Sequence, residues 1–137
     1  MNIVHMPKVF TSKSQKIGEI GEHVAVHYLQ NHDYTIIERN YTKKWGEIDI
    51  VASKGGVIHF IEVKSKLADL KKARNYVDVY KPEDGMHPWK IKRLIRTIQT
   101  YLLERRVKGD WQFDLIVLYL DNNARKAKVE FMENIIL

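Results

Sequence analysis

Apolar residues recur every three or four positions in two stretches of the chain, and this spacing predicts two long helices. The first begins at Ser12 or Ser14 and ends at 31–33, where Asn-His-Asp interrupts the pattern. The second begins at 87–88, because proline suits the first position of a helix, and ends at 109–110. The apolar positions are Ile17, Gly21, Val24, Ala25, Tyr28 and Leu29 in the first helix, and Ile91, Leu94, Ile95, Ile98 and Leu102 in the second.

Five other segments have the composition of strands, namely 34–39, 47–52, 57–65, 111–120 and 128–132. Segment 111–120 is almost continuously apolar, so it is expected to be buried on both faces. The order helix, three strands, helix, two strands predicts one α/β domain over residues 1–137, with a mixed five-stranded sheet flanked by helices. An irregular lead-in is expected at 1–11, and a polar, basic loop at 66–87.

Two adjacent glycines at 55–56 predict the tight turn of a β-hairpin, since both accept a positive φ angle. With these two residues as the turn, the pairing register follows along both strands. One face of the hairpin is then apolar at its centre, and the other gathers charged side chains. The facing pairs are Val51 with Phe60, Asp49 with Glu62 and Glu47 with Lys64, while Ile48, Ile50, Ile61 and Val63 fall on the opposite side.

The predicted pairing of Asp49 with Glu62 calls for a positive partner, because like charges directly opposed destabilise a pair of strands. A hard divalent cation meets this need, and Mg²⁺ requires only one or two carboxylates from the protein. Lys64 lies on the same face, roughly 6–7 Å along the strand from Glu62, where it would orient a water or offset charge on a phosphate. The competing interpretation is an ordinary hairpin whose charged face meets solvent.

Composition and charge narrow the classes of protein that fit. The chain has 137 residues, of which 45% are hydrophobic and 29% charged, and it contains no cysteine, which excludes disulfides, thiolate zinc sites and cysteine nucleophiles. Its longest apolar run, 115–120, is far too short to span a membrane, and the first residues lack a secretory signal, so a cytoplasmic protein is expected.

The net charge of +6 is unevenly distributed, because residues 64–108 carry 13 basic and 5 acidic residues. Such a block favours an anionic partner such as nucleic acid, although many basic surfaces are simply solvated. The second helix begins with cations, which oppose the helix dipole and are better explained by contacts to phosphate oxygens. These residues are Lys90, Lys92, Arg93 and Arg96, with Gln99 as a weaker candidate.

The succession of Asp49 and Glu62-Val63-Lys64 resembles the D-to-ExK core of the PD-(D/E)xK nuclease superfamily. Over roughly residues 16–136 the chain is similar to the YraN-type bacterial proteins, relatives of the Holliday junction resolvases within that superfamily. The strings that carry the similarity are Gly21-Glu22, Tyr28-Leu29, Arg39-Asn40-Tyr41, Gly46 to Ala52, Phe60 to Lys64, Lys90, Arg93-Leu94, Tyr101-Leu102 and Phe113-Asp114.

This resemblance implies a restriction-endonuclease-like fold and hydrolysis of phosphodiester bonds with Mg²⁺ or Mn²⁺. It implies that Asp49, Glu62 and the carbonyl of Val63 hold the metal, that Lys64 is the catalytic lysine, and that Glu22 from the first helix belongs to the same centre. An exposed helix glutamate is the alternative for Glu22, and Glu47 is a secondary candidate. The proline in the name of the superfamily is absent, since Ile48 precedes Asp49.

The predicted function is therefore a magnesium-dependent endonuclease, selective for DNA structure because no element reads base sequence. The resemblance to resolvases implies a homodimer, although no dimer stripe is visible. Two alternatives stay open: a nucleic-acid-binding module that has lost turnover, and an accessory protein whose basic surface binds an acidic protein. Among the other polar and aromatic residues, His23, His27 and His32 are expected in solvent, His59 at a hydrogen-bonded core edge, Asp114 in a structural role, and Trp45, Trp89 and Tyr80 either in packing or stacked on unpaired bases.

Overall fold

The computed structural model describes residues 2–6, 14–71 and 87–137. Both predicted helices and all five predicted strands are present, most of them one to four residues longer or shorter than expected. The part of the basic loop at 72–86, including Tyr80, lies outside the described residues. The elements are β1 (Asn2–His5), α1 (Ser14–Asn31), β2 (Thr35–Lys43), β3 (Gly46–Lys54), β4 (Val57–Leu67), α3 (Pro88–Glu104), β5 (Trp111–Asp121) and β6 (Lys126–Met132).

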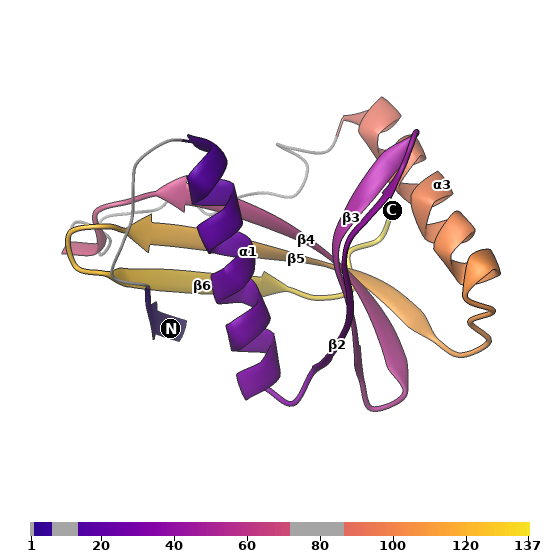
Figure 1. Ribbon diagram of the computed structural model, residues 1–137, viewed down its shortest axis with the longest axis horizontal. Coiled ribbons are helices and arrows are strands. Elements are labelled where there is room, and N and C mark those ends of the chain that lie inside the picture. Colours follow the sequence, from indigo (N-terminus) through magenta and orange to yellow (C-terminus); the bar gives the residue numbers. More distant parts are fainter. Residues whose placement is uncertain (1, 7–13, 72–86) are drawn as a thin grey trace.

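The strands form one mixed sheet in the order β1-β6-β5-β4-β3-β2 (Figure 1). Among the strands that the structure describes, only β4 and β5 run parallel, and the chain segment that connects them contains α3. The sheet has six strands instead of the predicted five, because Asn2–His5 pairs with the outer edge of β6. Four residues are too few to show a strand pattern, and their partner strand lies at the other end of the chain, so the expectation of an irregular lead-in was wrong for this segment.

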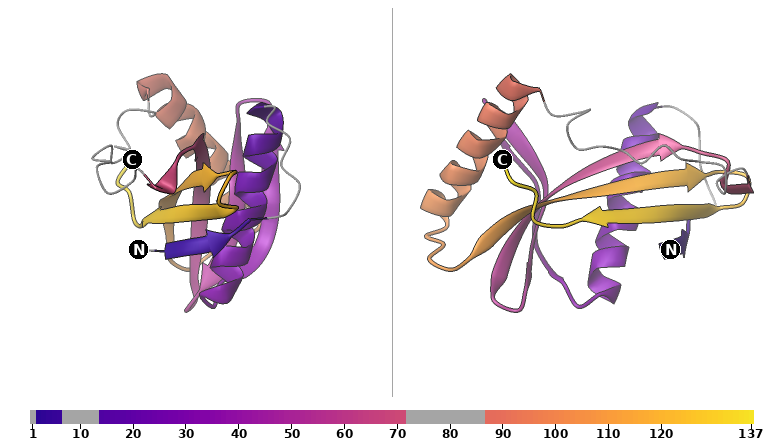
Figure 2. Two further views of the ribbon diagram at one scale, coloured as in Figure 1. Left: turned by 90° about the vertical axis from the view of Figure 1, so that its left-hand side faces the viewer. Right: turned by 180° about the vertical axis from the view of Figure 1, so that it is seen from behind.

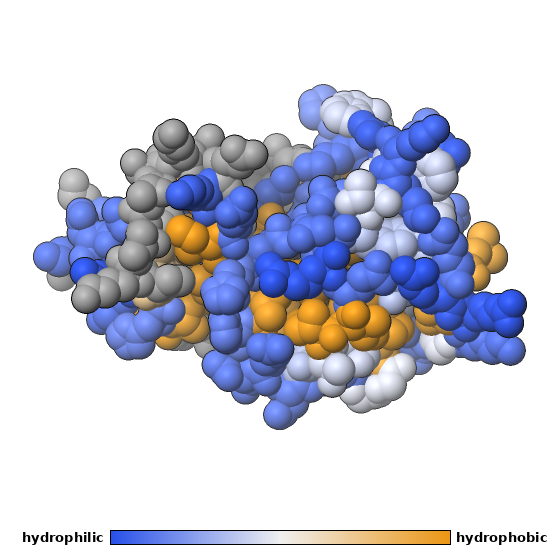
Figure 3. Space-filling model, in the orientation of Figure 1, coloured by the Kyte–Doolittle hydropathy of each residue, from blue (hydrophilic) through white to orange (hydrophobic). Residues whose placement is uncertain are grey.

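The two helices lie on opposite faces of the sheet (Figure 2). Val24, Ala25 and Leu29 of α1 belong to the core cluster on one face. Strand β5 contributes alternate residues to the two faces, as its apolar composition predicted. Its residues Ile116, Leu118 and Leu120 pack toward α1, and Leu115, Val117 and Tyr119 pack on the other side. Figure 3 views the face of the sheet that α1 covers, and hydrophobic surface is visible on both sides of this helix.

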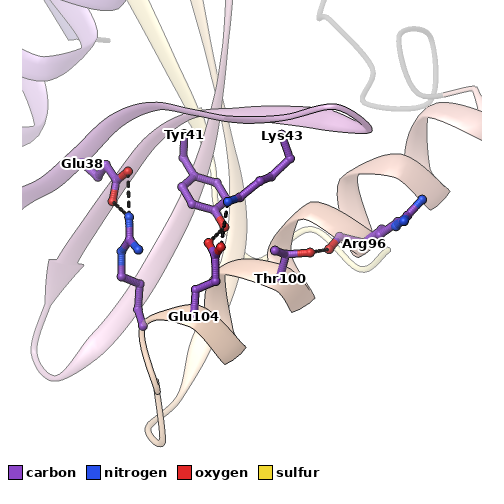
Figure 4. A network of polar contacts seen from close by, with 7 residues as sticks. Glu38, Tyr41, Lys43, Arg96, Thr100 and Glu104 are labelled. Atoms are coloured by element: carbon purple, nitrogen blue, oxygen red, sulfur yellow. Dashed lines mark hydrogen bonds and ion pairs between the residues drawn. The ribbon is translucent and has the colours of Figure 1, made fainter.

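Helix α3 packs over the β2–β3 end of the sheet, where Ile98 and Tyr101 meet Val51 and Phe60. Polar contacts add to this packing (Figure 4). Near the end of the helix, Glu104 accepts hydrogen bonds from Tyr41 and, at 2.7 Å, from Lys43 Nζ. Arg105 also donates to Glu38 Oε1 at 3.0 Å. Three side chains of β2 thus contact the last residue of α3 and the C-cap residue that follows it.

The hairpin turn at Gly55 and Gly56 is confirmed, with φ angles of 58° and 79°. The predicted register is also confirmed near the turn, where Val51 pairs with Phe60. His59 is buried and its Nδ1 lies 2.5 Å from Asp114 Oδ2, which is the hydrogen-bonded core position expected for it.

The ladder between β3 and β4 ends at the pair Ile50–Ile61, one residue short of Asp49 and Glu62. From this point β4 continues beside β5, and β3 continues beside β2. We call this divergence the fork. The predicted facing pairs Asp49–Glu62 and Glu47–Lys64 therefore do not form, because both lie beyond the last pair of the β3–β4 ladder.

The side-chain alternation of β3 also changes at the fork. Ile48 packs under α3 with Val51, whereas Ile50 packs under α1, so the prediction that both isoleucines share one face was wrong. On the adjacent β2, Asn40 lies opposite this part of β3 and has a φ angle of 53°, a left-handed conformation that asparagine accepts more readily than most residues.

Among the described residues, no helix has the length and apolar character needed to cross a membrane.

Gly46 lets the β2–β3 turn approach α3 closely. A Cβ atom at this position would lie 2.3 Å from Thr97 Oγ1 and 3.3 Å from the carbonyl oxygen of Arg93. We predict that Gly46→Ala lowers the free energy of unfolding by about 1–3 kcal/mol, because the buried Thr97 has no room to move away. Urea denaturation measures the effect.

Gly18→Ala is the matched control, because a Cβ at Gly18 in α1 meets nothing within 4 Å. This change should raise stability by about 0.5–1 kcal/mol through helix propensity. Equal effects of the two substitutions would contradict the close approach at Gly46.

Candidate functional site

A cavity of about 620 Å³ opens between the fork, the end of the β2–β3 hairpin and the first turns of α3. We call it the fork cavity. Its walls combine acidic residues from the strands with basic and aromatic residues from the helix. The lining residues are Thr42, Lys43, Gly46, Glu47, Asp49, Glu62, His87, Trp89, Lys90, Arg93 and Leu94.

Asp49 occupies the fork, where it takes a backbone donor that β3 no longer uses. The N–H of Val63 donates to Asp49 Oδ2 at 2.8 Å. Because the N–H and C=O groups of a strand residue point to the same edge, the Val63 carbonyl also faces the fork. Burial raises the pKa of Asp49 to about 7, the charges of Glu22, Glu62 and Glu47 act in the same direction, and the Val63 hydrogen bond opposes them.

Glu62 lies across the fork with its two oxygens in different environments. Its Oε1 is 3.4 Å from Lys64 Nζ and 3.3 Å from Lys90 Nζ. Its Oε2 is buried and has no hydrogen-bond partner. Burial and the neighbouring Lys64 ammonium lower the pKa of Lys90, while Glu62 raises it. One oxygen of the carboxylate is therefore compensated by two ammonium groups, and the other is not compensated.

Glu22 approaches the same region from α1, next to Arg39, whose Nη2 is 3.9 Å from Glu22 Oε1. With its amide nitrogen turned toward the carboxylates, Asn40 donates to Glu22 Oε1 and to Glu47 Oε1, at 3.1 Å each. Burial raises the pKa of Glu22, and Arg39 lowers it. Glu22 is thus a partly buried, bonded side chain and not the exposed helix glutamate of the alternative interpretation.

Sequence reasoning gave Asn40 no role, although it links Glu22 to Glu47. One signal was available, since asparagine is among the few residues that accept a positive φ angle. The contact itself depends on how α1 lies against β2, which no local pattern reports.

The fork cavity offers oxygen donors that suit a hard divalent ion. These are the carboxylates of Asp49 and Glu62 and the carbonyl of Val63, and the uncompensated Glu62 Oε2 is the clearest sign of a missing positive partner. Within the described ranges, no three acidic or histidine side chains converge closely enough to hold a metal ion. A two-carboxylate set with waters is sufficient for Mg²⁺, so the residues present fit this ion.

The structure divides the basic residues of α3 into two groups. Lys90 and Arg93 line the fork cavity, and Arg93 Nε donates to the carbonyl of Trp45 at 2.7 Å. Arg96 lies outside the lining, with its guanidinium 4.1 Å from the Trp45 ring centroid. Lys92 and Gln99 are exposed and do not line the cavity either.

Three histidines, two in α1 and one just after it, are exposed as the sequence predicted, and none of them lines the fork cavity. His23 and His27 are exposed, with their Nε2 atoms 3.2 Å apart, and His32 Nδ1 lies 2.7 Å from the carbonyl oxygen of Tyr28. Asp114 has the structural role expected for it, because it also accepts hydrogen bonds from Gln112 Nε2 and the N–H of Asn134, each at 2.8 Å.

Fold and site together define a mixed α/β domain of the nuclease-like type, with an acidic and basic cavity where two strands separate. The family model described as "Uncharacterised protein family UPF0102" matches residues 21–118. The chain belongs to this family, which is the YraN-type family that its sequence strings resembled. The matched region contains all the candidate site residues.

Individual relatives are similar over most of the chain. A UPF0102 protein of Campylobacter hominis is 35% identical over 125 residues, which cover 91% of this chain and 97% of the relative. A UPF0102 protein of Wolinella succinogenes is 36% identical over 124 residues, or 90% and 99% of the two chains. One from Persephonella marina is 39% identical over 115 residues, or 83% and 91%.

Asp49→Asn should stabilise the metal-free protein. The ordinary pKa of an aspartate, 3.8, applies to the unfolded chain, and the folded state raises it to about 7. The folded state therefore binds this proton more tightly, and wild-type stability falls as the pH rises from about 4 to about 7. Asparagine keeps an acceptor for the Val63 N–H and carries no charge. We expect a gain of roughly 1–3 kcal/mol at pH 8 and little gain at pH 4, in urea denaturation with a chelator present.

Asp110→Asn, an exposed position outside the cavity, is the control and should change stability little at any pH. A loss of stability at pH 8 in Asp49→Asn would show that the ionised carboxylate is well compensated in the fork.

Proposed function

We propose that this protein is a divalent-metal-dependent nuclease that hydrolyses phosphodiester bonds in nucleic acid, with DNA as its substrate. The observation that carries the proposal is the fork itself, where the partly buried Asp49 and the uncompensated Oε2 of Glu62 line one cavity. Leaving a buried carboxylate oxygen without a hydrogen-bond partner costs free energy, and arrangements of this kind are concentrated at functional sites.

Asp49, Glu62 and the Val63 carbonyl would hold Mg²⁺ or Mn²⁺. When bound, such an ion supplies Lewis-acid activation of a water and of the scissile phosphate. Glu22 and Glu47, tied together through Asn40, supply further negative charge beside this set and help to orient it. Hydrolysis adds the water across one P–O bond, so that one product keeps the phosphate and the other gains a hydroxyl group.

Lys64 and Lys90 act on the anionic side of the reaction. Both ammonium groups are within 3.4 Å of Glu62 Oε1, at the edge of the proposed ion site. A phosphate bound there gains two positive charges that offset the negative charge developing in the transition state. The pKa of Lys90 is lowered because burial leaves its ammonium group poorly solvated. A phosphate bound beside it would stabilise the charged form, as Glu62 already does.

The surroundings of the fork cavity suit a polyanion. The first turn of α3 has no acidic residue and its N-cap His87 makes no side-chain cap, so the N–H groups of the helix end remain available to an anion. The end of the molecule that carries this turn is predominantly hydrophilic (Figure 3). These features support binding through phosphates, without base-specific readout.

A second candidate function is a nucleic-acid-binding module without turnover. The double contact of Glu62 Oε1 with Lys64 and Lys90 favours it, because two ammonium groups already compensate much of this carboxylate. Cleavage separates the two candidates directly.

We expect Mn²⁺- or Mg²⁺-dependent cleavage of branched or single-strand-ended DNA, reduced at least about a hundredfold by Glu62→Gln and by Lys64→Ala. The measurement is gel separation of end-labelled products, with Mn²⁺ binding followed by calorimetry on the same samples. Glu62→Gln should abolish the calorimetric signal as well, whereas Lys64→Ala should preserve it.

Glu130→Gln and Lys128→Ala on β6 are matched controls, because Lys128 Nζ and Glu130 Oε1 form a 3.2 Å strand ion pair outside the cavity. Both should cleave like wild type. If no metal supports cleavage of any substrate while DNA still binds, the second candidate replaces the first.

Lys90 and Lys92 provide a matched pair for locating the DNA. Each is a lysine on the first turns of α3, but only Lys90 lines the fork cavity. In chelator, Lys90→Ala should weaken DNA binding several-fold and reduce the salt slope by about 1, while Lys92→Ala should leave the slope nearly unchanged. Fluorescence anisotropy over a series of salt concentrations measures both, and equal slopes would place the phosphates elsewhere.

A further inference from the structure

Trp89 is an exposed tryptophan on the wall of the fork cavity. Its exposed fraction is 58%, so it does not pack in the core. A tryptophan carries a large apolar surface, and leaving it in water forgoes the stabilisation that burial would give. Its position beside the proposed phosphodiester site therefore suggests that a ligand packs against it.

The backbone and one neighbour hold Trp89 in place. Pro88 occupies the first turn of α3 directly before it, which fixes the start of the helix. The Arg93 guanidinium lies 5.7 Å from the Trp89 ring centroid, and Arg93 is itself bonded to the Trp45 carbonyl. Trp89 is thus held by its neighbours while the residue as a whole stays 58% exposed. We call a side chain held and exposed in this way a platform.

The other aromatic candidates do not offer such a platform. Trp45 is only partly exposed, it has the Arg96 guanidinium 4.1 Å from its ring centroid, and its Nε1 is buried. Trp111 is 43% exposed but does not line the cavity, and it packs against Phe60 with ring centroids 5.7 Å apart.

Charge identifies the kind of occupant. The neighbouring cavity residues Lys90, Arg93, Glu47 and Glu62 are charged, which disfavours an apolar peptide or a lipid chain. A ligand with a flat aromatic group joined to a phosphate would stack on the Trp89 ring and bring the phosphate to Lys64 and Lys90. Lys90, the next residue in the chain, contacts Glu62 at the proposed ion site, so the flat group would lie close to the reacting phosphate.

Base pairing decides which nucleic acids can use this platform. A base inside a duplex is already stacked on its neighbours and presents only its edges, whereas an unpaired base can turn onto an aromatic side chain. The platform therefore selects for unpaired bases.

We propose that Trp89 is the stacking subsite for an unpaired nucleobase next to the scissile phosphate. The substrate class is nucleic acid with single-stranded ends, flaps or gaps, and this inference rests on the proposed function of the fork cavity. Stacking accepts any base, which agrees with the expectation from the sequence that the protein does not read base sequence.

The test compares two DNA hairpins of the same duplex sequence, one blunt and one with three unpaired nucleotides, by fluorescence anisotropy in chelator. Wild type should bind the extended hairpin about tenfold more tightly. Trp89→Ala should remove this preference and leave binding of the blunt hairpin unchanged, and Trp89→Phe should restore most of it. An equal loss of affinity for both hairpins would overturn the proposal.

Tryptophan fluorescence gives a second readout that folding defects do not imitate. The extended hairpin should quench the emission of wild type and of Trp111→Phe, and it should not quench that of Trp89→Phe. Quenching that persists in Trp89→Phe would also overturn the proposal. The same pair of hairpins made as RNA tests whether the subsite distinguishes DNA from RNA. If stacking alone is responsible, three unpaired nucleotides should increase the affinity equally in both.

The two proposals fail in different ways. Cleavage that depends on Glu62 but ignores Trp89 would retain the nuclease and remove the stacking subsite. A Trp89-dependent preference without cleavage under any metal would retain the subsite and remove the nuclease activity.

Discussion

Strand β4 is the element on which the site depends, because it cannot keep both of its partners along its whole length. It pairs with β3 only as far as Ile50–Ile61, and it continues beside β5 for six more residues. The separation frees the N–H of Val63, which then holds the Asp49 carboxylate. A sheet that stayed closed would use this N–H in its ladder and would leave no cavity between the hairpin and α3.

Opening the fork carries an energetic cost, and the rest of the fold offsets it. Asp49 and Glu62 are partly buried near further carboxylates, and one oxygen of Glu62 has no hydrogen-bond partner. Both faces of the sheet are meanwhile packed, and β5 contributes alternate residues to the two cores. The contacts of Glu104 with Tyr41 and Lys43 then hold the hairpin and α3 on either side of the cavity. Much of the packing that stabilises the fold thus lies away from the fork.

Local pattern was sufficient for most of the fold and for the members of the candidate site. The period of the apolar residues gave both helices, and the glycines at 55–56 gave the register near the turn. Alternation then failed at Ile48, which packs under α3 while Ile50 packs under α1, and a period-two pattern does not report such a change within one strand. Strand β1 was also beyond reach, since it joins segments that are far apart in the chain. The hairpin register and the family resemblance both named Asp49 and Glu62, but only the structure shows that they lie at a fork.

The structure changes the weight of the charge argument. Cations in the first turns of α3 oppose the helix dipole, and sequence alone attributed them to phosphate binding. Lys90 pairs with Glu62 and Arg93 bonds to the Trp45 carbonyl, so part of this positive charge has an intramolecular use. A count of basic residues therefore overstates the case for nucleic acid. What supports that partner is the combination in one cavity of an uncompensated carboxylate oxygen, ammonium groups beside it and an open aromatic ring at Trp89. A surface that is merely solvated has no reason to bring these three features together.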